Sequence, residues 1–137
     1  MKGASIVLML FISIQGVAAM PGGGAPAQDV LAMVGHDHFA ATANSQYAGV
    51  SDSALRIGLN AKIDAAATAL ATAASTKAST SQLLAILKQH LDGIDRDALD
   101  TEDAEHVADL FEKMLDSLGI QSSDGILNDW FYGFDPT

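Results

Sequence analysis

The sequence contains no cysteine, and it is poor in basic residues. Without cysteine there is no disulfide, no thiolate metal ligand and no thiol nucleophile, so the fold must rest on its hydrophobic core. Only 7 Lys and Arg stand against 17 Asp and Glu, which gives a net charge of −10 at pH 7. Nucleic acids and anionic lipids require a basic surface, so the composition argues against both as partners.

Recognisable catalytic motifs are also missing from the sequence. There is no Gly-x-Ser-x-Gly elbow and no glycine-rich phosphate loop before a helix. Carboxylate pairs are abundant, but no feature of the sequence singles out two of them as an acid and a base. We therefore predict a protein that is not an enzyme, with no catalytic residue and no cofactor.

No apolar run reaches the roughly 20 residues that a membrane-spanning helix needs. The longest run, 4–17, follows the single base Lys2 and precedes the small residues of Val17-Ala18-Ala19. This order predicts a secretory signal peptide over residues 1–19, cleaved after Ala19, and a periplasmic or secreted protein. An uncleaved N-terminal anchor remains the alternative. After cleavage, no stable membrane insertion is expected.

The rest of the chain has helical spacing and no sustained strand alternation. We predict a flexible linker over 20–27 and a single helical domain over 28–137. The predicted fold is all-α, a four-helix bundle or an irregular helical array with a short C-terminal aromatic helix. The expected helices cover 28–47 with a break at Gly35, a segment beginning after Ser51 or Ser53, a segment from the Ser79 and Gln82 capping box to Gly93, and a segment from Asp100 to Gly119.

Acidic residues concentrate in the last third of the chain. Residues 20–91 are neutral, whereas residues 92–137 carry 13 acids against Arg96 and Lys113. A solvated surface is one interpretation, and a binding face for a basic protein partner is the other. The acids expected on that face are Asp100, Glu102, Asp103, Glu105, Asp109, Glu112 and Asp116.

Four aromatic residues cluster within residues 130–134. Trp130 and Tyr132 are suited to anchor an interface, because both are large and partly polar. The same cluster could instead fold back as a lid on an alanine-rich core. The lid interpretation places Trp130 and Phe134 inside and Tyr132 nearer the solvent.

Histidines and aspartates offer two candidate metal sites, but the sequence predicts no metal site. His36 and His38 flank Asp37, and their spacing could chelate one ion only in an extended segment. The aspartates of the 92–103 loop suggest calcium, but the helix–loop–helix template fails from Asp95 onward, so capping of helix ends is the favoured role. His106 has acidic neighbours at helical spacing and is expected to be a surface histidine.

The C-terminal segment carries a resemblance. Ser122-Ser123-Asp124-Gly125 and Tyr132-Gly133-Phe134-Asp135 resemble the end of a family of small, uncharacterised, exported bacterial helical proteins. The match covers roughly the last 40 residues, and it implies a helical domain with no assigned activity. In overall plan the chain is also similar to periplasmic immunity proteins that block cell-wall amidase toxins. Those proteins often carry cysteines, which this chain lacks.

The sequence leaves the function unknown, with one leading hypothesis. It is a non-catalytic periplasmic or secreted binding protein, of the immunity or inhibitor type, that meets a basic partner through the acidic face. One alternative is a metal-handling protein or enzyme centred on His36 and His38. The other is a self-associating module, because an alanine-faced helix over 54–78 could support a homodimer.

Overall fold

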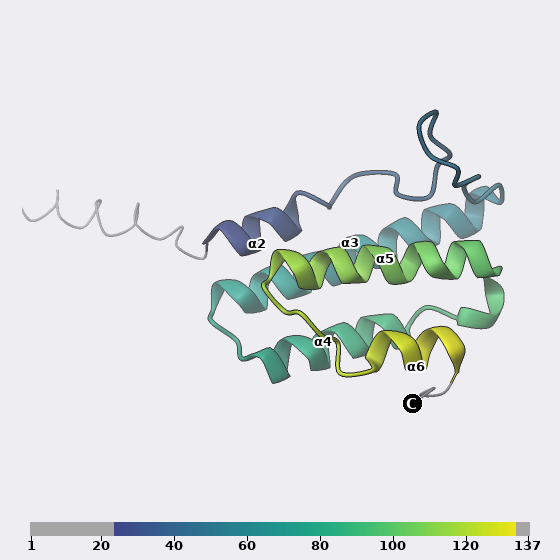
Figure 1. The fold of residues 1–137 in the computed structure, drawn as a ribbon. Coiled ribbons are helices and arrows are strands. Elements are labelled where there is room, and N and C mark those ends of the chain that lie inside the picture. The colour runs from purple at the N-terminus through teal and green to yellow at the C-terminus, as the bar shows by residue number, and fades with distance from the viewer. Residues whose placement is uncertain (1–23, 134–137) are drawn as a thin grey trace, which may run out of the picture.

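A computed structural model describes residues 24–133, and the predicted signal peptide lies outside them. The described chain contains no strand, which confirms the all-α prediction. Figure 1 shows an irregular helical array in which α5 lies in front of α3, with α4 and α6 along one side. The elements are α2 (Gly24–Leu31), α3 (Ser53–Ser75), α4 (Thr80–Asp92), the 3₁₀ helix η2 (Arg96–Ala98), α5 (Thr101–Ser117) and α6 (Ile126–Tyr132).

Side-chain caps set the starts of the three long helices. Asp52, between the two expected serines, caps α3, because its Oδ1 accepts from the Leu55 N–H at 3.0 Å. The predicted capping box of Ser79 and Gln82 is present at the start of α4. Asp100 caps α5 as predicted, and its Oδ1 lies 2.8 Å from the Asp103 nitrogen.

Gly119 ends α5 as the sequence predicts. Its φ of +76° is a left-handed conformation that glycine adopts without a Cβ penalty. Its N–H donates to the Asp116 carbonyl, and the Ile120 N–H donates back to the Leu115 carbonyl. Ile120 is buried beside this turn, so the two bonds and the apolar contact together form a Schellman end.

The core is formed by one face of each of α3, α4 and α5. The predicted apolar faces are confirmed where they matter most, since Ile63, Leu70 and Phe111 are fully buried. Alanines at 66, 67 and 71 of α3 are buried as well, and their small side chains let neighbouring helices approach closely. Among residues 24–133, no helix is long and apolar enough to cross a membrane.

The N-terminal part of the domain differs from the prediction. Residues 24–27, expected in a flexible linker, form the first turn of α2, and Ala27 is buried against the core. The helix expected over 28–47 ends at Leu31, and residues 36–50 form a long loop. The loop carries Phe39 into the core with no exposed surface. Burial of this ring outweighs the local helical spacing on which the prediction was based.

Candidate functional site

Five exposed acids form a straight line along α5. Their steps of three and four residues put them on one helix face, which we call the acidic stripe. Within residues 24–133, none of their side chains takes part in an ion pair or a hydrogen bond. The stripe consists of Glu102, Glu105, Asp109, Glu112 and Asp116.

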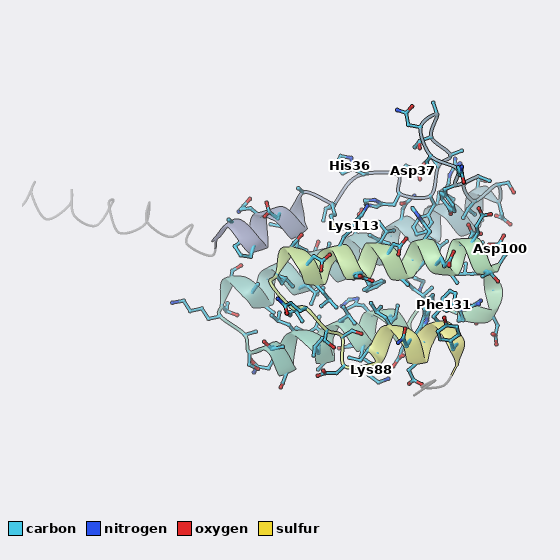
Figure 2. The ribbon with its side chains drawn as sticks, in the orientation of Figure 1. His36, Asp37, Lys88, Asp100, Lys113 and Phe131 are labelled. Carbon is cyan, nitrogen blue, oxygen red and sulfur yellow. The ribbon has the colours of Figure 1, made fainter. Side chains whose placement is uncertain are left out.

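A shallow hollow of about 360 Å³ lies along the C-terminal half of the stripe. It is lined by Asp109, Glu112 and Asp116, with Leu110 and Lys113 beside them. Lys113 is the single base of α5, and Figure 2 shows it toward the end of the helix opposite Asp100. The hollow therefore offers three carboxylates, with Lys113 beside them, to a cationic group.

Two acids predicted for the binding face have structural roles instead. Asp100 is the N-cap of α5. Asp103 is only 9% exposed, and its Oδ1 accepts a 2.6 Å hydrogen bond from the Tyr47 hydroxyl. The prediction that Asp103 meets a partner is therefore wrong, because the loop before α3 covers it.

The C-terminal aromatic residues pack mainly as a lid. Trp130 is half-buried against the core, and its indole N–H donates to the Ile94 carbonyl at 3.1 Å. Arg96, which sequence reasoning did not single out, donates from Nε to the Phe131 carbonyl and lies over the Phe131 ring. Tyr132 is 55% exposed, as the lid interpretation predicts. Phe134 lies outside the described residues.

The loop over residues 36–50 is fastened at both of its ends, and we call it the anchored loop. The Val50 N–H donates to the Phe39 carbonyl at 2.8 Å, so the two ends meet. At this closure Gly49 has φ +79°, and a Cβ placed there would lie 2.5 Å from the Ala41 nitrogen. Only glycine allows the two backbone segments to come this close.

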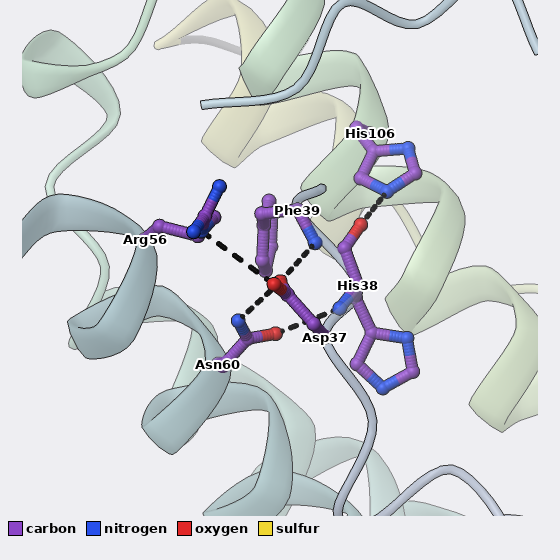
Figure 3. A network of polar contacts seen from close by, with 6 residues as sticks. All are labelled: Asp37, His38, Phe39, Arg56, Asn60 and His106. Carbon is purple, nitrogen blue, oxygen red and sulfur yellow. Dashed lines mark hydrogen bonds and ion pairs between the residues drawn. The ribbon is translucent and has the colours of Figure 1, made fainter. Parts of the chain in front are cut away.

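Asp37 ties the anchored loop to α3. Its Oδ1 accepts from Asn60 Nδ2 at 2.8 Å and from the Phe39 N–H at 3.2 Å, and its Oδ2 lies 3.5 Å from Arg56 Nε (Figure 3). The Asn60 hydrogen bond lowers the pKa of the Asp37 carboxyl, and the Phe39 N–H and the Arg56 charge act in the same direction. Asn60 also accepts from the His38 N–H at 2.9 Å.

His106 holds the anchored loop against α5. Its ring stacks on Tyr47 with centroids 4.1 Å apart, and it meets the edge of Phe39 at 5.4 Å. Its Nε2 bonds to the His38 carbonyl, as Figure 3 shows, and must carry the proton because a carbonyl only accepts. His106 also lines the hollow beside Asp109, and its ring is half-buried because the anchored loop packs against it, a contact across 68 residues that local spacing does not show.

Tyr47 completes this contact between the loop and α5. Burial raises the pKa of its phenol, and the hydrogen bond to Asp103 raises it further. The phenol therefore remains a hydrogen-bond donor well above the pH at which an exposed tyrosine ionises. No feature of the sequence indicated that Tyr47 and Asp103 meet, because they lie 56 residues apart.

The two candidate metal ligands, His36 and His38, lie near one another but do not converge on one point. The rings of His36 and His38 have centroids 6.1 Å apart, and His38 Nε2 donates to the Met33 carbonyl. In the aspartate-rich loop, Asp92 pairs with Lys88 at 2.6 Å and Asp95 caps η2. The described chain holds no group of three His, Asp or Glu side chains arranged for a metal ion.

The helical domain matches a known family along nearly its whole length. Residues 25–135 match the family model described as Domain of unknown function (DUF4844). The chain belongs to this family. The expected kinship with an uncharacterised family is thus confirmed in its general form, over far more of the chain than the C-terminal segment that suggested it.

A solved structure shares the fold of this DUF4844 protein. The crystal structure of a DUF3571 family protein from Acinetobacter baumannii AYE is 41% identical, with a TM-score of 0.75. The alignment covers 81% of this chain and 91% of that one. No curated protein matches the sequence. Because neither family description assigns an activity, a functional assignment rests on the surfaces described above.

Proposed function

We propose that this DUF4844 protein is a non-catalytic binding protein whose acidic stripe engages a basic protein partner. The observation that carries the proposal is the alignment of five exposed carboxylates without partners in the described chain. From Glu102 to Asp116 the stripe is about 21 Å long at 1.5 Å per residue. A rigid helix of this length presents a fixed row of charges to a complementary surface.

Such a row acts mainly on the rate of encounter. Complementary charge accelerates association, and salt weakens the effect because the screening length is about 10 Å at 0.1 M. The hollow lined by Asp109, Glu112 and Asp116 would receive a lysine or arginine side chain of the partner. Export of the protein, which the signal-like residues 1–19 predict, is part of this proposal. An inhibitor of a basic exported enzyme, of the immunity type, is its most specific form.

The test compares two variants with the same change in net charge. The stripe variant neutralises four stripe acids with isosteric amides, and the control variant neutralises four exposed acids elsewhere. The stripe variant is Glu105→Gln, Asp109→Asn, Glu112→Gln and Asp116→Asn. The control variant is Asp29→Asn, Asp97→Asn, Asp124→Asn and Asp129→Asn.

Each protein is immobilised and exposed to the exported fraction of the producing cells, at about 0.05 M and about 0.3 M salt. We expect the wild type and the control variant to retain the same basic protein at low salt. The stripe variant should fail to retain it, and high salt should release it from the wild type and the control variant. Equal capture by the stripe and control variants would show that the stripe only solvates the protein.

A further inference from the structure

A second hollow, of about 220 Å³, lies between the end of α5 and the start of α6. It shares Glu112 and Asp116 with the hollow along the acidic stripe, so these two acids stand between the two hollows. Figure 1 shows the chain leaving the end of α5 and turning back to α6, and residues of this turn line the second hollow. We call it the α5–α6 hollow.

The lining of the α5–α6 hollow contains acids and neutral polar residues. None of the described residues that line it is a base, whereas Lys113 lines the hollow on the stripe side. At about 100° per residue, Lys113 lies about 160° from Leu115 around α5, so it is directed away from the α5–α6 hollow. The neutral polar residues of the lining are Gln121, Ser122, Ser123 and Asn128.

Hydrogen-bond acceptors in this lining are free, while two of the backbone donors nearby are used. The Asp124 N–H donates to Ser122 Oγ at 3.1 Å, and the Leu127 N–H donates to Ser123 Oγ at 3.3 Å. Four side chains that line the hollow take part in no ion pair or hydrogen bond within residues 24–133. They are Glu112, Asp116, Gln121 and Asn128. Two carboxylates and two amide oxygens are therefore available to a ligand that donates.

The end of α5 adds to the negative potential at the hollow. The last carbonyl groups of a helix carry a partial negative charge, and a base in the last turn offsets it. The last turn of α5 contains no base, and it carries Asp116 instead. Glu112 lies one turn earlier, at a spacing where two like charges repel each other. A cation bound at the hollow would offset both unfavourable effects.

We propose that the α5–α6 hollow binds a guanidinium group, and that a partner of the acidic stripe supplies it from an arginine side chain. The source of the group rests on the function proposed above, but the guanidinium site does not. A planar guanidinium has five N–H donors and pairs with a carboxylate through two of them. Its other N–H groups would donate to the side-chain oxygens of Gln121 and Asn128. An ammonium group has three donors and is more strongly hydrated, so arginine is preferred to lysine.

The two hollows together describe the partner's surface. Glu112 and Asp116 form a ridge, with the stripe hollow on one side and the α5–α6 hollow on the other. A partner with two neighbouring basic side chains could place one on each side of this ridge. The side chain on the α6 side would be arginine, because only that hollow adds neutral amides to the two acids.

Nuclear magnetic resonance titration with two small probes tests the α5–α6 hollow. The full chain is expressed, and the soluble protein it yields is isotope-labelled. N-acetyl-arginine methylamide and N-acetyl-lysine methylamide carry the same single positive charge at neutral pH. We expect the arginine probe to shift the amide signals of residues 121–128 saturably, with a dissociation constant on the order of 1–10 mM. The lysine probe should bind at least about threefold more weakly.

An amide variant and its control locate the bound probe. Asn128→Ala removes one neutral acceptor without a change of charge, and it should weaken arginine binding about threefold. Gln89→Ala removes an exposed amide on α4, away from the hollow, and should leave the binding unchanged.

An acid variant and its control test the two carboxylates. Glu112→Gln combined with Asp116→Asn should weaken arginine binding at least about tenfold, because charge-assisted hydrogen bonds are lost. Asp29→Asn combined with Asp97→Asn changes the net charge equally at exposed positions elsewhere, and it should weaken binding less than about twofold.

Three results would overturn the guanidinium site. They are shifts that do not saturate by about 50 mM, equal affinity for the two probes, and equal effects of a hollow variant and its control. A basic partner captured through the stripe, without saturable arginine binding, would remove this site and leave the proposed function standing. Saturable arginine binding without a captured partner would support the site and count against the proposed function.

Discussion

Removing one oxygen atom from Tyr47 tests whether the anchored loop is fastened to α5 as described. Tyr47→Phe keeps the ring that stacks on His106 and deletes only the hydroxyl that donates to Asp103 Oδ1 at 2.6 Å. Asp103 is 9% exposed, so water replaces the lost donor poorly. A hydrogen bond to a charged group contributes about 1.5–3 kcal/mol, and we expect the free energy of unfolding to fall by that amount.

The measurement is a double-mutant cycle at pH 7. Urea unfolding, followed by far-UV circular dichroism, is recorded for the wild type, Tyr47→Phe, Asp103→Ala and the double variant. Loss of Asp103 also removes an acid from the first turn of α5, and the cycle separates this effect from the hydrogen bond. A coupling energy of about 1.5–3 kcal/mol is expected. Coupling below about 0.5 kcal/mol would refute a buried hydrogen bond that fastens the loop.

Three other predictions concern the same region. Gly49→Ala should destabilise the fold by at least about 2 kcal/mol more than Gly35→Ala in urea unfolding, since both have positive φ but only a Cβ at 49 meets backbone at 2.5 Å. The free energy of unfolding, measured with urea, should decrease above about pH 10. In that range the Tyr47 phenol of the unfolded chain ionises, whereas the raised pKa in the native state keeps the native phenol protonated. Tyr47→Phe should flatten this decrease. Calorimetric titration with zinc should show no saturable 1:1 binding, because the described residues hold no group of three His, Asp or Glu side chains arranged for a metal ion.

Each of these three predictions has an outcome that would contradict it. Equal losses for the two glycine variants would mean that the loop ends do not cross closely. Parallel pH profiles for the wild type and Tyr47→Phe would mean that the phenol is not perturbed in the native state. A 1:1 zinc isotherm that His36→Ala abolishes would restore the metal-handling hypothesis.

The family match limits what can be transferred to this chain. DUF4844 is described only as a domain of unknown function, and the Acinetobacter structure confirms the fold without an activity. The acidic stripe is therefore a hypothesis about this chain's own surface, tested by the stripe and control variants.

Local spacing along the chain by itself determines much of this protein. The Asp100 cap, the apolar positions of α5 and the Gly119 end could all be predicted, because a cap, an amphipathic face and a glycine stop each depend on residues within a few positions. The capping box of Ser79 and Gln82 could be predicted in the same way. The acidic stripe follows from the same periodicity, and only its extent needed the structure.

The tertiary structure decided the rest, beginning with the end of α2 at Leu31. Phe39, Tyr47 and His106 meet through contacts between segments that are far apart in the chain, and no helical periodicity encodes such a meeting. Their contact buries Asp103 and removes it from the acidic surface. A local pattern determines which face of a helix is polar. Which polar residues then stay exposed to water depends on the segment that packs over them. Here that segment is the anchored loop, and burial of Phe39 favours its position against α5.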